Sequence, residues 1–326
     1  MKAVVRTRYG SPDVLQLKEV IRPTPTDDEV LIKIHSTSVN RTDWEGLTGE
    51  PLYARIGGLR KPRHPVLGSD IAGRVEAVGK NITRFQPGDE VFGDIMWRMG
   101  GFAEYVCAGE KSLALKPAGL TFEEASAIPQ AGVIALQGIR DKGQVKQGQK
   151  VLINGAGGGT GMFAVQLAKL YGAEVTGVDN AGKLDFMRSI GADHVIDNTR
   201  EDFTRSGKQY DLILDVIAYR SVFAYRRALK PNGSYFAVGG SIATMLQIML
   251  LGPWIRRRTG KKIRYLIVQP NIKDLVYITE LCEAGKVVPA IDRRYPLSEA
   301  PEALRYLGEE RARGKIVITM EENNEA

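Results

Sequence analysis

A glycine-rich octapeptide constrains the fold of this chain more than any other segment. Residues 154–161 have the sequence NGAGGGTG and follow a short apolar segment, residues 151–153. Residues 161–171 come next, and their apolar positions recur with helical spacing until a glycine ends the run. A strand, a glycine loop and a helix in this order are typical of the first turn of a parallel α/β sheet.

The small residues of this loop indicate a phosphate-binding turn. Ala156, Gly158 and Gly161 fit the spacing A/G-x-G-x-x-G, which allows a tight turn, a close approach of a pyrophosphate and close packing of helix on sheet. The helix N-terminus adds free N–H groups and a partial positive charge. We therefore expect a dinucleotide to contact Ala156, Gly157, Gly158, Gly159, Thr160 and Gly161.

An acidic residue follows the next predicted strand, residues 174–178. Asp179 lies 18 positions after Gly161, where a carboxylate can accept hydrogen bonds from an adenosine ribose. A carboxylate repels a 2′-phosphate, so Asp179 favours NADH. Lys183 and Arg200 follow in the sequence and would favour NADPH if either paired with that phosphate. The residues leave the choice of cofactor open.

The pattern of predicted elements changes near residue 121. Before it, residues 30–35 and 71–78 alternate like half-buried strands among loops. After it, strands alternate with short helices, which predicts an α/β fold with a doubly wound parallel sheet. The strands expected for that sheet are residues 151–153, 174–178, 194–196, 212–216, 235–238 and 264–268. A helix over 274–284 and a strand over 315–319 precede an acidic tail, residues 321–326.

Composition excludes several classes of protein. The 326 residues include 45 Lys and Arg against 38 Asp and Glu, a net charge of +7 that we take to be interspersed along the chain. This excess suits a phosphate-bearing small ligand, and we expect no nucleic-acid partner. The two cysteines and three histidines are scattered, which argues against a disulfide framework and against a zinc site built from soft ligands.

The longest apolar segment, residues 242–255, is interrupted by Gln247 and by Gly252-Pro253. Since a bilayer-spanning helix needs about 20 apolar residues, we expect no transmembrane segment. Arginines and lysines follow it at 256–258 and 261–262. It is either an interfacial membrane helix or a helix that lines a cleft or contacts a second subunit, and we favour the latter. The N-terminus lacks the features of a signal peptide, so we expect a cytoplasmic protein.

Motifs along nearly the whole chain carry a family resemblance. They are SVN at 38–40, TDW at 42–44, HPVLGSDIAGRVEAV at 64–78, PGDEVFG at 87–93, AIPQAGVIAL at 127–136, GQKV at 148–151, GADHVID at 191–197, YPL at 295–297 and GKIV at 314–317. With the glycine loop, they resemble the medium-chain dehydrogenase/reductase superfamily, in its zinc-independent quinone oxidoreductase and enoyl reductase-like branch.

The resemblance implies an architecture and a set of cofactor contacts. A Rossmann NAD(P)-binding domain, residues 123–267, would be inserted into a β-rich GroES-like catalytic domain made of residues 1–122 and 268–326. The family also implies a homodimer and a tendency towards NADPH. Further cofactor contacts would be Ala131, Gly132, Lys183, Asn198, Val216, Gly239, Gly240, Val268 and Lys315.

Zinc-dependent relatives carry a Cys at the position of Asn40 and a His-Glu pair at Ser69-Asp70, and this chain has neither thiol nor imidazole there. The cysteine-rich lobe of those relatives is also missing from residues 94–101. The resemblance therefore implies a zinc-independent reductase of substrates that are already electrophilic, namely quinones and α,β-unsaturated carbonyls. An atypical alcohol dehydrogenase and a non-catalytic NAD(P)H-binding sensor are the alternatives.

Reduction of such a substrate places negative charge on an oxygen, which needs a hydrogen-bond donor or a proton. Two residues are our catalytic candidates. Asn40 matches a branch asparagine near the nicotinamide end of the cofactor, and Tyr53 lies in a polar, glycine-containing segment, residues 53–63, expected to form an irregular loop.

Overall fold

The computed structural model describes residues 1–56 and 58–320 and divides into two compact units. The first unit contains residues 1–130, 270–283 and the chain from 291 onward, and the second contains 131–269 and 284–290. The sequence placed domain boundaries at 122/123 and at 267/268; the units divide at 130/131 and 269/270. The acidic tail expected at 321–326 lies outside the described residues.

The second unit is built on a six-stranded sheet in the order β10-β9-β8-β11-β12-β13, with every neighbouring pair parallel. The chain runs outward from β8 in one direction and then, from β11, in the other, which is the doubly wound arrangement the sequence predicts. Its strands are β8 (Lys150–Asn154), β9 (Glu174–Asp179), β10 (His194–Asp197), β11 (Tyr210–Asp215), β12 (Leu229–Ala237) and β13 (Lys262–Tyr265).

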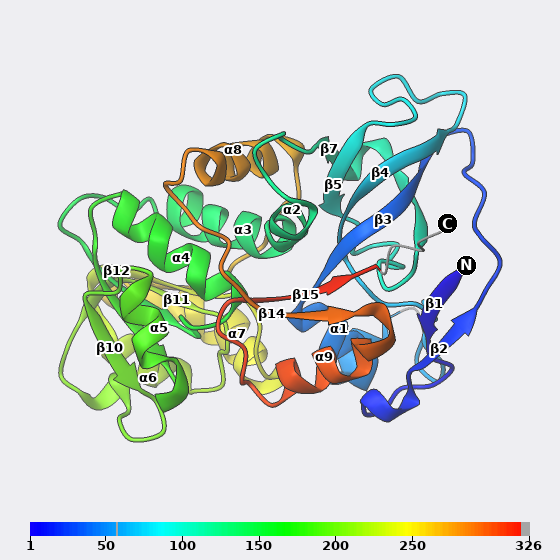
Figure 1. Cartoon of the computed structure of the whole chain (residues 1–326). Helices are drawn as coiled ribbons and strands as arrows, with labels where there is room; N and C mark the ends of the chain where they lie inside the picture. The colour runs from blue at the N-terminus through cyan, green and yellow to red at the C-terminus, as the bar shows by residue number, and fades with distance from the viewer. Residues whose placement is uncertain (57, 321–326) are drawn as a thin grey trace. The chain divides into compact units, whose positions relative to one another are not determined.

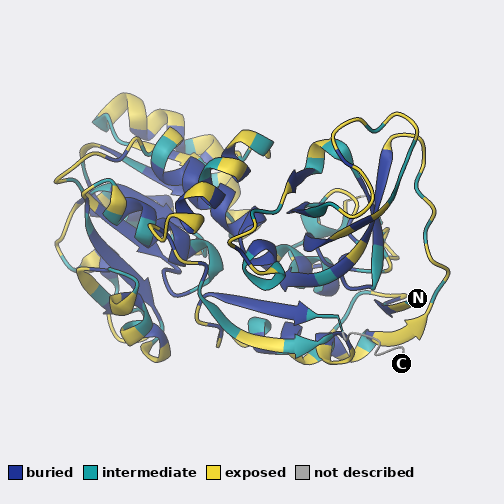
Figure 2. Cartoon of the chain, turned by 45° about the horizontal axis from the view of Figure 1, so that its top comes forward, coloured by how far each residue is buried: buried dark blue, intermediate teal, exposed yellow. Residues whose placement is uncertain are grey.

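Helices pack on this sheet beside the strands they follow or precede (Figure 1). They are α4 (Gly159–Leu170), α5 (Leu184–Ser189), α6 (Val222–Ala228) and α7 (Ile242–Thr259), with short turns η4 (Gln137–Lys142), η5 (Ala181–Lys183) and η6 (Phe203–Arg205). Helix α3 (Pro129–Leu136) begins at the end of the first unit and continues into the second. Tyr225 of α6 stacks on Tyr235 of β12 at a ring separation of 4.1 Å. Buried residues follow the strands of the sheet, as Figure 2 shows in dark blue.

The first unit contains a seven-stranded sheet in the order β14-β15-β3-β4-β5-β7, with β6 paired to β3. The strand predicted at 315–319 is β15, which lies between β14 and β3 (Figure 1). The strands are β3 (Glu29–Val39), β4 (Asp70–Val78), β5 (Glu90–Asp94), β6 (Tyr105–Gly109), β7 (Leu113–Leu115), β14 (Ile291–Pro296) and β15 (Lys315–Thr319), and β1 (Lys2–Val5) pairs with β2 (Gln16–Glu19) in a separate ribbon.

Short helices complete the first unit, and two of them begin with strong capping signals. The Asn40 N–H donates to Asp43 at the start of α1, and the Thr121 hydroxyl accepts from the Glu124 N–H at the start of α2. The helices are α1 (Arg41–Thr48), α2 (Phe122–Ala127), α8 (Ile272–Glu283) and α9 (Ala300–Gly308), with turns η1 (Pro12–Val14), η2 (Leu52–Arg55), η3 (Glu110–Ser112) and η7 (Leu297–Glu299).

The apolar segment at 242–255 forms most of α7, an 18-residue helix with Pro253 inside it. Among the residues that the structure describes, no helix combines the length and the apolar character needed to cross a membrane.

Candidate functional site

The glycine loop joins β8 to α4 through a turn that depends on backbone geometry. Gly155 has φ +84°, a left-handed conformation that favours glycine. The N–H groups of Gly155 and Ala156 both donate to the Val178 carbonyl on β9, at 2.9 and 3.1 Å. The loop is thereby fixed to the second strand before Gly158 starts the helix as its N-cap.

The glycines of the loop serve different purposes. A Cβ on Gly161 would lie 2.1 Å from the Gly155 carbonyl oxygen and 2.6 Å from the Ala156 Cα, so this glycine lets the helix pack on the turn. A Cβ on Gly158 would meet only the Gly155 oxygen, at an ordinary 3.5 Å. Internal packing among the described residues therefore does not require a glycine at 158, whereas the close approach of a phosphate would.

Asp179 lies at the end of β9, and its carboxylate has three polar partners in the structure. It accepts the Gly157 N–H at 3.0 Å and the Asn180 N–H at 2.9 Å, and the Lys183 amine lies 3.2 Å away. Asp179 is 4% exposed and Lys183 6% exposed, so the ion pair is buried against the glycine loop. Arg200, by contrast, is exposed and lies 3.5 Å from Asp197.

Several other residues expected to contact the cofactor lie at the same carboxyl edge of the sheet. The Asn198 N–H donates to the Asp179 carbonyl, and the Val216 N–H donates to the Asn154 carbonyl. Gly239 and Gly240 follow β12, and Val268 comes after β13. Ala131 and Gly132 are buried in α3. In open α/β sheets this edge, between the strands where the order reverses, is where ligands bind.

The sequence analysis missed a buried polar group at this edge. Asp215, at the end of β11, accepts the Asn154 side-chain amide at 2.8 Å and the Tyr235 hydroxyl at 2.9 Å, and it also accepts the N–H groups of Ile217 and Ala218. It therefore holds the ends of three neighbouring strands together and shapes the turn that contains Val216. The only signal in the sequence was an acid inside an otherwise apolar run.

The first unit contains a buried polar cluster around Asn40. The Asn40 side-chain NH2 donates to the Ser69 hydroxyl at 3.1 Å and to the Asp70 carboxylate at 2.9 Å. Its carbonyl accepts from the Lys315 amine at 2.5 Å. Both amide hydrogens of Asn40 are thus engaged, so donation to a substrate oxygen would require one of these bonds to open.

Lys315 places a cation in the middle of this cluster. Its side chain is 2% exposed, and its amine lies 3.6 Å from the Asp70 carboxylate, which is itself inaccessible to solvent. Asp70 also accepts from the Ser38 hydroxyl and the Gln130 N–H. Burial lowers the pKa of Lys315 and raises that of Asp70, while their mutual attraction opposes both changes.

Two further carboxyls near the cluster have raised pKa values. Burial raises the pKa of Asp43 to about 7, although the Asn40 and Gly68 N–H groups bind its charged form. Burial, followed by the nearby charge of Asp70, raises the pKa of Asp94 to about 7. The cluster can therefore hold a proton near neutral pH.

Tyr53, the second catalytic candidate, lies half-buried in the turn η2, which packs against α1. Part of the loop expected at 53–63 is therefore regular, and residue 57 lies outside the described chain.

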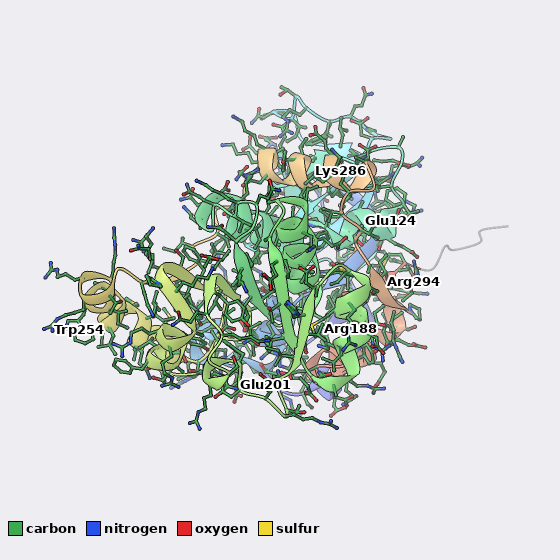
Figure 3. All side chains as sticks on the ribbon, turned by 90° about the vertical axis from the view of Figure 1, so that its left-hand side faces the viewer. Glu124, Arg188, Glu201, Trp254, Lys286 and Arg294 are labelled. Atoms are coloured by element: carbon green, nitrogen blue, oxygen red, sulfur yellow. The ribbon has the colours of Figure 1, made fainter. Side chains whose placement is uncertain are left out.

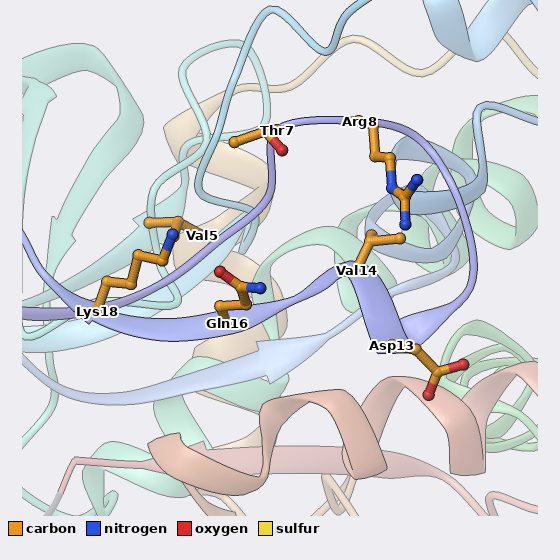
Figure 4. Close-up of a pocket in the computed structure, with 7 residues that line it drawn as sticks. All are labelled: Val5, Thr7, Arg8, Asp13, Val14, Gln16 and Lys18. Carbon is orange, nitrogen blue, oxygen red and sulfur yellow. The ribbon is translucent and has the colours of Figure 1, made fainter.

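A pocket in the same unit, drawn in Figure 4, is lined by none of the predicted site residues. One of its lining residues, Asp13, forms an ion pair with Arg305 at 2.9 Å. Its lining is Val5, Thr7, Arg8, Asp13, Val14, Gln16 and Lys18.

Comparison with known proteins identifies the family. Residues 26–119 match the alcohol dehydrogenase GroES-like domain, and residues 190–318 match the zinc-binding dehydrogenase model. The 2-methylene-furan-3-one reductase of Solanum lycopersicum is 34% identical over 330 residues, which cover 98% of this chain and 79% of the relative. The chain belongs to the medium-chain dehydrogenase/reductase superfamily.

Other members of the superfamily agree in sequence and fold. The chloroplastic NADPH-dependent alkenal/one oxidoreductase of Arabidopsis thaliana is 31% identical, across 98% of this chain and 79% of the relative. The structure of the quinone oxidoreductase from Coxiella burnetii superposes with a TM-score of 0.87 at 29% identity, covering 98% and 99% of the two chains. The predicted family and α/β fold class are therefore confirmed.

The description of one matching family model raises the question of zinc in this medium-chain reductase. The family resemblance places Asn40, Ser69 and Asp70 where zinc-dependent relatives have their ligands, and these three residues supply one amide, one hydroxyl and one carboxylate. Within residues 1–56 and 58–320, no group of three or more His, Cys, Asp or Glu side chains could hold a metal ion. This donor set does not fit a zinc ion, which prefers thiolate and imidazole ligands.

The raised carboxyl pKa values predict a pH-dependent stability. Because the folded chain holds a proton on Asp94 that the unfolded chain releases above about pH 4, unfolding becomes easier as pH rises towards 7. The free energy of unfolding should therefore fall between pH 5 and 7. Asp94→Asn mimics the protonated acid, so we expect this fall to be about 2 kcal/mol smaller in the variant than in the wild type. Urea denaturation of the wild type and the variant between pH 5 and 7 measures the free energy of unfolding at each pH. If the free energy of unfolding depends on pH in the same way in both proteins, Asp94 does not titrate between pH 5 and 7.

Proposed function

We propose that this medium-chain reductase transfers hydride from NAD(P)H to a quinone or an α,β-unsaturated carbonyl compound. The observation that carries the proposal is the glycine loop, which leaves space at Gly158 directly before the N-terminus of α4 and beside Asp179. That arrangement suits a pyrophosphate and its neighbouring ribose.

The residues of the second unit fit a nicotinamide cofactor. When bound, NAD(P)H would supply the hydride. The N–H groups in the first turn of α4 would hold the pyrophosphate, and Asp179 would accept from the adenosine ribose. We propose that Ala131, Gly132, Asn198, Val216, Gly239, Gly240 and Val268 complete this site, as the family resemblance implies.

The substrate class follows from the chemistry of the cluster in the first unit. Asn40, Ser69 and Asp70 lack the donors with which a zinc ion could activate an alcohol, so the substrate must accept hydride by virtue of its own conjugation. A quinone or enone does so, and several relatives of the chain are named for such substrates.

The negative charge that develops on the substrate oxygen needs a donor. We propose Tyr53 for that role and Asn40 as the residue that orients the neighbouring hydrogen bonds. The Lys315 amine fixes the Asn40 carbonyl, which in turn directs both Asn40 amide hydrogens. We assign Lys315 to positioning this amide, because its amine is buried among Asn40 and Asp70.

We propose a preference for NADH. The Lys183 amine is held by Asp179 and the Arg200 guanidinium lies beside Asp197, so both cations that the sequence offered for a 2′-phosphate already have an acidic neighbour. The family tendency points the other way, and the ratio of turnover with the two cofactors decides between them.

We also propose a cytoplasmic homodimer. Both cysteines, Cys107 and Cys282, are buried free thiols, which suits a reducing compartment. The dimer rests on the resemblance alone, and light scattering of the purified protein tests it.

The central experiment follows reduced-nicotinamide absorbance with metal-stripped protein, NADH or NADPH, and a quinone or an enone. Turnover that is insensitive to chelators supports the proposal. Cofactor binding without turnover would make the chain a sensor protein, and turnover only of alcohols with oxidised cofactor would make it a dehydrogenase. Absence of cofactor binding would overturn the assignment of the glycine loop.

The role of Tyr53 has its own test. We expect Tyr53→Phe to lower kcat by about tenfold, since the hydroxyl is lost but water can partly replace it. The KM for the nicotinamide cofactor should not change, because Tyr53 belongs to the other unit from the glycine loop. Tyr9→Phe, which removes a hydroxyl bonded to the Gly58 carbonyl, is the control. An unchanged kcat in Tyr53→Phe would remove Tyr53 from the mechanism.

A further inference from the structure

The net positive charge of the chain comes from one segment of the second unit, because that segment contains no acidic residue. Residues 216–269 contain ten of the 45 Lys and Arg residues and no Asp or Glu, which leaves 35 basic against 38 acidic residues elsewhere. The expectation that both signs are interspersed is therefore wrong for this segment. Since the rest of the chain is slightly acidic, the whole net charge of +7 originates here.

The same segment exposes a row of large apolar side chains on α7. Their spacing of three and four residues places them on one face of the helix. They are Ile242, Met245, Leu246, Met249, Leu250 and Trp254, with exposures from 37% for Met245 to 75% for Leu250. The structure thus leaves an apolar helix face open to solvent, which is uncommon unless something covers it.

The opposite face of α7 fixes the helix in place. Thr244, Ile248 and Ile255 are buried, the two isoleucines in the core of the second unit. A Cβ on Gly252 would lie 2.5 Å from the Ile263 carbonyl oxygen on β13, so the helix packs directly against the sheet edge. The exposed row is therefore held outward by packing, and Figure 3 shows Trp254 on the outer side of α7.

A basic cluster continues the apolar row. Arg256, Arg257 and Arg258 form the exposed last turn of α7, and the Arg258 guanidinium lies 5.6 Å from the centre of the Trp254 ring. Lys261 and Lys262 follow after Thr259 and Gly260. We call the apolar row together with these three arginines the α7 surface.

We propose that the α7 surface docks the protein on an anionic lipid membrane. Apolar side chains can enter the boundary between headgroups and acyl chains, a tryptophan suits that boundary, and the arginines attract anionic headgroups. The helix lies along the membrane in this arrangement and does not cross it. Docking is independent of the proposed reductase activity, although it would place the protein where lipophilic quinones dissolve.

Other occupants fit the α7 surface less well. A second copy related by a twofold axis through this face would bring two arginine triplets together with no acidic residue of the segment between them. The phosphates of a nucleic acid could pair with the arginines, but Met249 and Leu250 would stay exposed to water. Of these three occupants, an anionic membrane matches both the charge and the apolar row.

The test is flotation of the full chain with vesicles of phosphatidylcholine alone or with about one third phosphatidylglycerol. We expect binding to the anionic vesicles only, weakened at least tenfold in Met249→Ser/Leu250→Ser and in Arg257→Gln/Arg258→Gln. Lys18→Gln/Lys111→Gln, which removes two exposed charges from the first unit, should bind like the wild type. Brominated lipids should quench the tryptophan fluorescence of the wild type, and should quench that of Trp254→Phe much less.

Three results would overturn the proposal. Equal binding by all variants would show that the α7 surface is not the docking site. Loss of a dimer in Met249→Ser/Leu250→Ser would assign the surface to a second copy of the chain. Binding to double-stranded DNA that depends on the arginines but not on Met249 and Leu250 would assign it to a nucleic acid. Circular dichroism of each variant checks folding, and turnover with quinone reports the reductase site separately.

Discussion

Replacing Gly158 with alanine should weaken NAD(P)H binding severely and leave the protein folded. The backbone at this position, φ −90° and ψ −179°, is open to alanine, and the new methyl group would meet only the Gly155 oxygen at 3.5 Å. A phosphate seated on the N-terminus of α4 would meet the same methyl group directly. We expect the Kd for NADH to rise more than 100-fold, since the pyrophosphate provides much of the affinity. Calorimetric titration and a melting curve measure the two effects.

Gly161→Ala is the matched control for this prediction. Its methyl group would lie 2.1 Å from the Gly155 oxygen, so the turn or the helix must shift and we expect the melting temperature to fall. The two alanines, three residues apart in the same loop, thus separate binding from folding. Normal cofactor affinity in Gly158→Ala would mean that no phosphate approaches the loop there.

The second unit was predictable from sequence because local signals specify it. Short apolar strands and helices with glycine stops predicted the order of elements, and the parallel pairing then follows from the connections. Strand ends were less certain: residues 264–268 were expected as a strand, but β13 is Lys262–Tyr265. The observed strand begins two residues before the predicted one and ends three residues before it. Its position depends on the packing of α7 against β13, a tertiary contact that the local sequence pattern does not indicate.

The cluster around Asn40 was only partly predictable. Asn40 and Lys315 were both singled out, but 275 positions separate them and nothing local indicates that their side chains meet. Only the pairing of β15 with β3 brings them together. Lys315 was expected to contact the cofactor, which stays a prediction, and in the structure its amine bonds to Asn40 in the first unit. Asp94 was passed over because its raised pKa depends on burial and on a neighbour in the adjacent strand.

The ion pair between Asp179 and Lys183 explains why the sequence alone left the cofactor open. Both residues were noted as opposing signals, and the structure places their charged groups 3.2 Å apart. The carboxylate therefore restrains the lysine as well as repelling a 2′-phosphate. Removing the Asp179 carboxylate should favour NADPH for two reasons, because the repulsion of the 2′-phosphate is lost and the Lys183 amine is freed.

We expect Asp179→Ser to raise the ratio of kcat/KM for NADPH to that for NADH by about 100-fold. A unit charge about 5 Å from a phosphate is worth about 3 kcal/mol at a partly buried site, and the freed Lys183 amine becomes available to the 2′-phosphate. Steady-state kinetics with both cofactors measures the ratio. Asp179→Ser combined with Lys183→Met should lose most of the gain, whereas Asp197→Ser, beside the exposed Arg200, should leave the ratio close to that of the wild type. A ratio unchanged in Asp179→Ser would mean that the adenosine ribose does not lie at the end of β9, and the preference would then have to be set elsewhere on the sheet edge.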